Sequence, residues 1–163
     1  MQKRGQIQLS FGMIFSIIII IVTIAIAVYV IVYFVNLGKC TNVALFYDEF
    51  ENRIDESWNS QITSGTYEGK VSSGVEQVCF GLLQGSVDDK SKEAFEVLRR
   101  YRNEEANVFL YPIKHLCRNS VPYRNIEHMK TENFFCVDVK DGKVTIKISK
   151  ETGDSLVLVS GTK

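Results

Sequence analysis

The chain has 163 residues, 45% of them hydrophobic and 23% charged, which indicates one ordinary globular domain without low-complexity segments. Its 19 basic and 19 acidic residues give a formal net charge of zero, so there is no electrostatic reason to expect nucleic acid as a partner. The sequence holds no G-x-S-x-G, H-E-x-x-H, phosphate-loop or G-x-G-x-x-G motif, and we expect neither an enzyme nor a cofactor.

The first predicted element is a transmembrane helix over residues 6–38. Its centre, residues 11–35, is apolar apart from Ser16, Thr23 and two tyrosines, and no charged residue lies between positions 5 and 38. A run of this length would rise about 37 Å as a helix, which is enough to cross a bilayer. A buried core helix would show polar residues every few positions, and a cleavable secretory signal would have a shorter apolar region.

The charges on either side of this run predict its orientation. Lys3 and Arg4 precede the run, whereas Asp48 and Glu49 follow it after a single nearby lysine, Lys39. Short positively charged flanks stay on the cytoplasmic side of a membrane. We therefore expect a single-pass protein of the cell membrane, with a cytoplasmic N-terminus and an extracellular domain over residues 39–163.

The helix is expected to continue beyond the membrane, from near Ser10 to Trp58, with a bend at Gly38 because glycine weakens a helix interior. After Gly38 the apolar residues recur at steps of three and four, which is the spacing of one helical face. The residues of this stripe are Cys40, Val43, Tyr47, Phe50, Ile54 and Trp58. We expect Phe50 and Trp58 to be buried against a sheet.

Strand patterns follow in the second half of the chain. The clearest is an alternation on both sides of Asp141-Gly142, with Val137 and Val139 before the turn and an alternating run to Ile148 after it, which predicts a β-hairpin. A third strand is expected at Leu156–Val159, weaker strands at Val75–Phe80 and Val108–Tyr111, a short helix at Lys90–Arg102 and an irregular loop at Pro112–Asn133. The expected fold is α+β, with one long helix whose outer half packs on a small antiparallel sheet and one short extra helix.

Four cysteines, Cys40, Cys79, Cys117 and Cys136, all follow the apolar run. An even number on the oxidising side of a membrane predicts two disulfides. If Phe135 and Val137 face the helix, the alternation of a strand turns Cys136 to the other side, so a Cys40–Cys136 bond is the least expected. Two connectivities remain: Cys40–Cys79 with Cys117–Cys136, or Cys40–Cys117 with Cys79–Cys136.

The two histidines, His115 and His128, lie in the irregular segment near Cys117. There is no C-x-x-C pair, so the spacing of a zinc site is missing and we expect no metal. Enzymatic activity would have to depend on His115, Cys117 and His128, and the sequence offers no third group to orient the histidine.

The N-terminus carries the most specific motif, Lys3-Arg4-Gly5-Gln6 directly before the apolar run. It resembles the class III signal peptide of archaeal type IV pilins and related pilin-like proteins. The resemblance implies that a membrane-embedded prepilin peptidase cuts between Gly5 and Gln6, so that residues 1–5 are a cytoplasmic leader. It also implies that the chain is a subunit, main or minor, of a type IV filament or related surface machine. Such a subunit contacts other pilin-like subunits through its N-terminal helix.

One position departs from the pattern of that family. Many pilins carry Glu at the fifth mature position, where its charge pairs with the N-terminal amine of a neighbouring subunit, whereas this chain has Ser10 there. A hydroxyl does not neutralise an amine in lipid. The alternative function is therefore a monomeric anchored domain that binds a ligand or partner outside the cell.

Overall fold

The computed structural model describes residues 11–113 and 121–162, and the chain divides into two compact units, Met1–Leu37 and Gly38–Lys163. The helix α1, Phe11–Asn59, is 49 residues long and contributes residues to both units. Its end lies one residue beyond the predicted one, while the predicted start at Ser10 lies outside the described residues. A long N-terminal helix that continues into the folded domain is thus confirmed.

The described part of the second unit contains two four-stranded sheets in place of the one small sheet that we expected. Sheet A has the order β1 (Thr63–Lys70), β7 (Lys143–Lys150), β8 (Val157–Gly161), β5 (Met129–Lys130). Sheet B has the order β4 (Tyr123–Arg124), β3 (Val108–Tyr111), β2 (Gln77–Phe80), β6 (Phe135–Asp138). All pairs are antiparallel except β5 with β8, which is parallel. The α+β class is confirmed.

The predicted hairpin is correct in its turn and wrong in its pairing. Lys140 and Lys143 exchange two backbone hydrogen bonds of 2.9 Å around Asp141 and Gly142, whose φ angles of 51° and 72° suit a tight two-residue turn. Beyond this turn the strands separate, because β6 pairs with β2 and β7 pairs with β1 and β8. Both strands bury apolar side chains in one core but from different sheets, which makes the turn a corner between the sheets.

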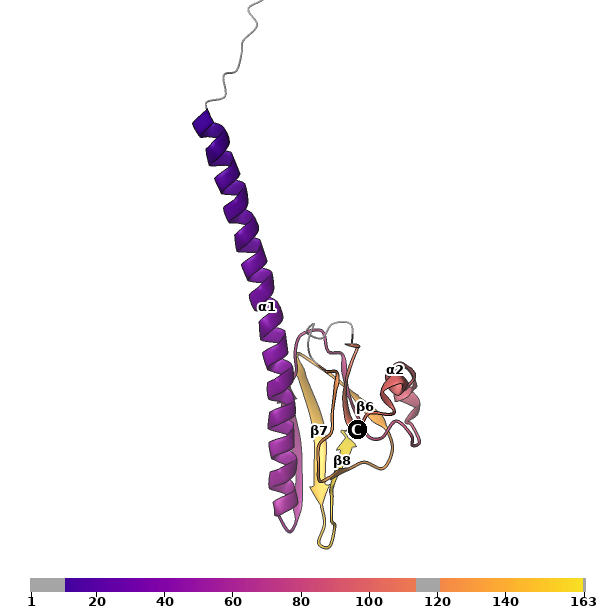
Figure 1. Ribbon diagram of the computed structural model, residues 1–163. Helices are drawn as coiled ribbons and strands as arrows, with labels where there is room; N and C mark the ends of the chain where they lie inside the picture. The colour runs from indigo at the N-terminus through magenta and orange to yellow at the C-terminus, as the bar shows by residue number, and fades with distance from the viewer. Residues whose placement is uncertain (1–10, 114–120, 163) are drawn as a thin grey trace, which may run out of the picture. The chain divides into compact units, whose positions relative to one another are not determined.

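The main core is formed by α1 and the inner faces of both sheets (Figure 1). The α1 residues Phe46, Phe50 and Ile54 are fully buried there. The prediction for Phe50 is confirmed, and that for Trp58 is wrong, since Trp58 is 37% exposed. The buried stripe of α1 includes Ser57, which leaves the adjacent Trp58 at the edge of the packed face.

β1 is a strand that the sequence pattern does not reveal, since its side chains are mostly polar or absent. Gly65, Tyr67 and Gly69 alternate along it, and the ring of Tyr67 packs against the core. A Cβ on Gly69 would lie 2.7 Å from Tyr67 Cε1 and 3.0 Å from Phe46 Cε2. Gly69 therefore allows helix and strand to approach closely where any side chain would collide.

The predicted helix at Lys90–Arg102 is confirmed as α2, Lys92–Leu98, with short 3₁₀ segments η1 (Asp89–Ser91) and η2 (Arg99–Tyr101) at its ends. Its buried residues Ala94 and Leu98 belong to a second core on the outer face of sheet B. Sheet B is thus covered on both faces. The Pro112–Asn133 segment, expected to be wholly irregular, contributes β4 and β5.

Candidate functional site

The first candidate surface is the apolar part of α1 in the first unit. Every residue from Phe11 to Leu37 is exposed, and the large hydrophobic side chains of this stretch are at least 40% accessible on all sides of the helix. Within the described residues, α1 is the helix that is long and apolar enough to cross a membrane. Soluble monomers rarely expose a continuous apolar surface of this size, and a lipid bilayer is the solvent that suits it.

Aromatic side chains mark the end of this apolar run. Tyr29, Tyr33 and Phe34 are 71%, 57% and 62% exposed, and the rings of Tyr33 and Phe34 meet edge to face at 6.0 Å. Tyrosines collect at membrane–water interfaces, where the ring lies in the apolar region and the hydroxyl reaches water. Their place at the end of the run fits a membrane anchor whose boundary lies a few residues before Gly38.

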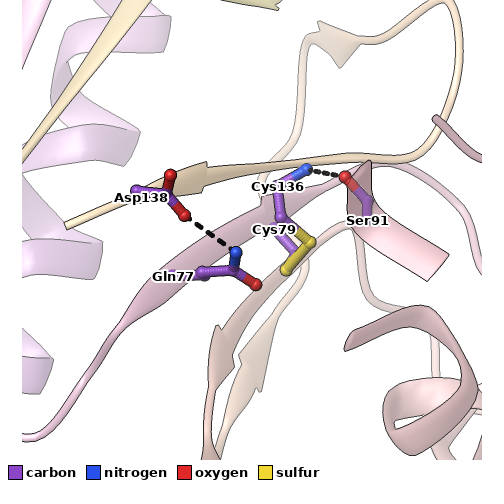
Figure 2. The surroundings of a disulfide bond; sticks show 5 residues. All are labelled: Gln77, Cys79, Ser91, Cys136 and Asp138. Atoms are coloured by element: carbon purple, nitrogen blue, oxygen red, sulfur yellow. Dashed lines mark hydrogen bonds between the residues drawn. A yellow bond between two sulfur atoms is a disulfide. The ribbon is translucent and has the colours of Figure 1, made fainter. Parts of the chain in front are cut away.

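The disulfide Cys79–Cys136 joins β2 to β6 at directly opposite positions of the register, with the two Cα atoms 3.9 Å apart (Figure 2). The Cys136 N–H donates to Ser91 Oγ at 2.8 Å, which ties the outer edge of β6 to η1. On the same strands, Gln77 Nε2 donates to Asp138 Oδ1 at 2.8 Å. The bond thus joins the edge strand β6 to its neighbour β2 on the face of sheet B that α2 covers.

This bond decides between the connectivities that the sequence left open. It excludes Cys40–Cys79 with Cys117–Cys136, and it leaves the scheme that assigns Cys40 to Cys117. Cys117 lies outside the described residues, so that second bond stays a prediction. The argument from strand alternation is confirmed, because Val137 packs against the main core and Cys136 against the second core.

Arg124 is a central charged residue that sequence reasoning missed. Its guanidinium makes ion pairs with Asp48 at 2.9 Å and Glu51 at 2.8 Å, two carboxylates one helical turn apart on α1. It also lies 5.9 Å from the centre of the Tyr47 ring, a cation–π distance. No pattern in the sequence indicates this contact, because it joins residues 76 positions apart through a two-residue strand.

His128 takes part in packing and not in a cluster of ligands. Its ring stacks on Trp58 with a centroid separation of 3.8 Å and an interplanar angle of 10°, and Trp58 Nε1 donates to the Ser155 carbonyl at 3.1 Å. Among residues 11–113 and 121–162, no group of three His, Cys, Asp or Glu side chains is placed to hold a metal. His115 and the processing residues Lys3, Arg4, Gly5 and Gln6 lie outside the described residues.

Two shallow hollows open on the surface of the second unit. One of about 470 Å³ lies beside η2 and is lined by residues such as Leu82, Tyr101, Arg102 and Glu104. The other, of about 240 Å³, lies between α1 and the turn that joins β6 to β7. We call the latter the turn hollow; its lining residues are Asn42, Leu45, Glu49, Lys70, Val71, Asp141, Gly142 and Lys143.

The described residues therefore offer surfaces suited to binding: an apolar helix and two shallow hollows of mixed polarity on a disulfide-bonded domain. No family model, curated protein or solved structure matches this chain.

Proposed function

We propose that this chain is a membrane-anchored, pilin-like protein whose N-terminal helix holds the folded domain at the cell surface and joins it to other subunits. One observation carries the proposal: α1 is a single helix that is apolar and exposed on all sides as far as Leu37, and then buries one stripe from Val43 onward. The first part of such a helix suits contact with lipid on all sides, and the second part suits packing of one face against protein.

The second unit supports an extracellular position. It has its own core, built from the α1 stripe and both sheets, and is cross-linked by Cys79–Cys136. Disulfides persist in oxidising surroundings and are rare in the cytosol. With Lys3 and Arg4 holding the N-terminus inside, the anchored domain lies outside the cell.

The pilin-like role adds processing and assembly to this anchor. In the proposal, the prepilin peptidase cuts after Gly5, and the apolar helix stays with the mature chain as the surface that contacts other subunits. The β-branched residues that dominate positions 17–22 present a smooth surface, which suits loose side-by-side packing more than a tight small-residue dimer.

The test of processing is the mass of the mature chain, purified from membranes that contain the peptidase. The expected mature protein begins at Gln6. Gly5→Leu places a bulky side chain at the cleavage position and should leave the full-length chain, whereas Gly12→Leu, the same change inside the helix, should be cut normally. An intact Met1–Gly5 segment in the unmodified protein would contradict the proposal.

The alternative is a monomeric anchored domain that binds a partner outside the cell, and Ser10 favours it because the assembly charge is missing. Cross-linking in native membranes separates the two functions. Two cysteines introduced together at Ile18 and Ile24 should give ladders of cross-linked subunits if the helix assembles, because each subunit can then bond to two neighbours. A chain that stays monomeric while its leader is still removed would favour the alternative.

A further inference from the structure

The strand β1 forms one edge of sheet A, and half of its backbone groups point away from the sheet. Lys143 exchanges its backbone N–H and C=O bonds with Lys140, so these groups do not face β1. Lys70, the register partner of Lys143, therefore turns its own N–H and C=O outward, while the Val71 N–H bonds the Gly142 carbonyl. The alternation of the ladder turns the same groups outward at the other even-numbered positions, Ser64, Thr66 and Glu68.

This edge is open within the part of the chain that the structure describes. No hydrogen bond joins the outward backbone groups to another described residue, and all four residues are exposed. The other three edge strands are short or covered: β4 and β5 have two residues each, and β6 donates from Cys136 to Ser91. β1 pairs over eight residues without proline or bulge, and a long edge of this kind is a template for another strand.

One flank of α1 runs beside the open edge. A Cβ on Gly65 would lie 3.8 Å from Arg53 Nη2, and the carboxylate of Glu49 is close enough to Tyr67 to add to the rise in the pKa of that tyrosine. Leu45, which is 50% exposed, lines the turn hollow at the end of β1. Because these three α1 residues are four positions apart, they follow one side of the helix.

A strand added to β1 would meet this flank at a matching spacing. Alternate residues of a strand are about 6.6–6.8 Å apart, and helix residues four positions apart are about 6 Å apart. The odd-numbered positions of β1 face α1, so the residues opposite them would also point to α1. In an antiparallel strand they would meet Leu45, Glu49 and Arg53 in that order. The complementary residues are apolar, basic and acidic.

The basic residue is the strongest of these requirements. Glu49 is exposed and forms no ion pair with any described residue, whereas Arg53 already pairs with Glu56 at 3.2 Å. A carboxylate without a partner beside a row of unpaired backbone groups favours a strand that carries a lysine or arginine at this position.

We propose that the open edge of β1 binds an extended segment of a partner protein as an additional antiparallel strand, whose residues facing α1 follow the pattern apolar-x-basic-x-acidic. Antiparallel pairing is the more stable arrangement per residue. Backbone hydrogen bonds would supply the affinity, and the flank of α1 the choice of sequence. The site lies wholly within the second unit, so it is independent of membrane anchoring, leader cleavage and filament assembly.

The test uses the full-length, isotope-labelled chain in a neutral detergent, titrated with the end-blocked peptide T-V-T-K-T-E-T and followed by NMR. The amides of Thr66, Glu68 and Lys70 should shift and become protected from exchange. The peptide T-V-T-E-T-K-T has the same composition and should bind about tenfold more weakly, because two ion pairs become like-charge contacts. Unchanged amides up to millimolar peptide, or equal binding of the two peptides, would overturn the proposal.

Backbone pairing is tested with N-methylated forms of the first peptide. Methyl groups on the two threonines beside the lysine block N–H groups that face β1, and they should abolish binding. Methyl groups on the lysine and the glutamate block N–H groups that face away, and they should preserve it. Equal effects of the two modifications would contradict an added strand.

The role of α1 is tested by Glu49→Lys, which should abolish the preference between the two peptides, since each then makes one favourable and one like-charge contact. Glu132→Lys makes the same change beyond β5, at the opposite edge of sheet A, and should keep the preference. Circular dichroism checks that both variants fold. A preference that survives Glu49→Lys, or a peptide-free chain that sediments as a dimer with these β1 amides already protected, would overturn the assignment to a partner segment.

Discussion

At the scale of single residues, the main core is closely packed and encloses polar groups that lack hydrogen-bond partners. The hydroxyls of Tyr47 and Tyr67 are buried and have no partner in the described part of the chain. Burial raises the pKa of both tyrosines, and that of Tyr67 reaches about 12, with the carboxylate of Glu49 adding to the effect. Gly69 packs beneath the Tyr67 ring.

The first prediction concerns Gly69. Gly69→Ala places a methyl group within 3 Å of the Tyr67 ring and at contact with Phe46, so we expect unfolding free energy to fall by about 1–3 kcal/mol. Gly65→Ala is the matched control on the same strand, where the nearest atom is Arg53 Nη2 at 3.8 Å, and it should leave stability within about 0.5 kcal/mol. Urea unfolding of both variants checks this, and equal losses would contradict the packing argument.

The second prediction is a loss of stability at high pH. The ordinary tyrosine pKa is 10, and that of folded Tyr67 is about 12, so the folded state holds this proton more tightly than the unfolded state. The stabilisation is complete below pH 10 and is lost as the pH rises through 12. Urea midpoints at pH 8 and pH 11.5 should fall less for Tyr67→Phe than for the unmodified chain, and an equal fall would refute the assignment.

At the scale of elements, short strands and loops are secured by side chains from distant positions. Asn107 is the clearest case: its Nδ2 donates to the Ile126 carbonyl and its Oδ1 accepts from the Ile126 N–H, both at 2.8 Å. This pair of bonds holds the segment between β4 and β5, where Ile126 is only 1% exposed. Arg124 secures the same segment to α1 through Asp48 and Glu51.

The third prediction follows from this pair of bonds. Asn107→Ala leaves the N–H and C=O of Ile126 without their partner in a buried setting, so unfolding free energy should fall by about 2 kcal/mol. Asn103→Ala removes the same side chain from an exposed loop and serves as the control, with little change expected. Thermal unfolding by circular dichroism measures both, and unchanged stability of Asn107→Ala would show that water replaces the amide.

The fourth prediction concerns the cysteines. Peptide mapping without reduction should recover Cys79 linked to Cys136 and Cys40 linked to Cys117. Replacing Cys79 and Cys136 together by Ala opens a loop of 57 positions and should lower unfolding free energy by about 4 kcal/mol in the chain-entropy model. A Cys40–Cys79 peptide in the unmodified protein would contradict the register of β2 and β6.

At the scale of the whole molecule, one helix provides both the apolar run that we propose as the membrane anchor and a large part of the domain core. The apolar run ends before the buried stripe begins, so that α1 is exposed on all sides as far as Leu37 and one-sided from Val43. Anchoring and domain folding therefore depend on different residues of one element, and substitutions can separate them.

The fifth prediction tests that separation. Ile20→Lys with Ile24→Lys puts two charges into the apolar run, at about 2.5–3.5 kcal/mol each for insertion near the helix centre, and should release the chain from membranes in an alkaline carbonate wash. Ile62→Lys with Leu82→Lys makes the same change at two exposed apolar residues of the second unit. That control should stay in the membrane fraction, and retention of both variants would contradict the anchor.

The sequence by itself determined the apolar run, the face of α1 that meets the domain, the short helix and the faces of Cys136 and Val137. Those features follow from the periods of helix and strand, which show what side of an element is buried. Only the tertiary structure decided that the strands beside Asp141-Gly142 belong to different sheets, that β1 is a strand, and that Lys70 and Lys140 flank Lys143. The physical reason is that a period identifies a buried face but not the element that covers it, and a strand rich in glycine has no period to detect.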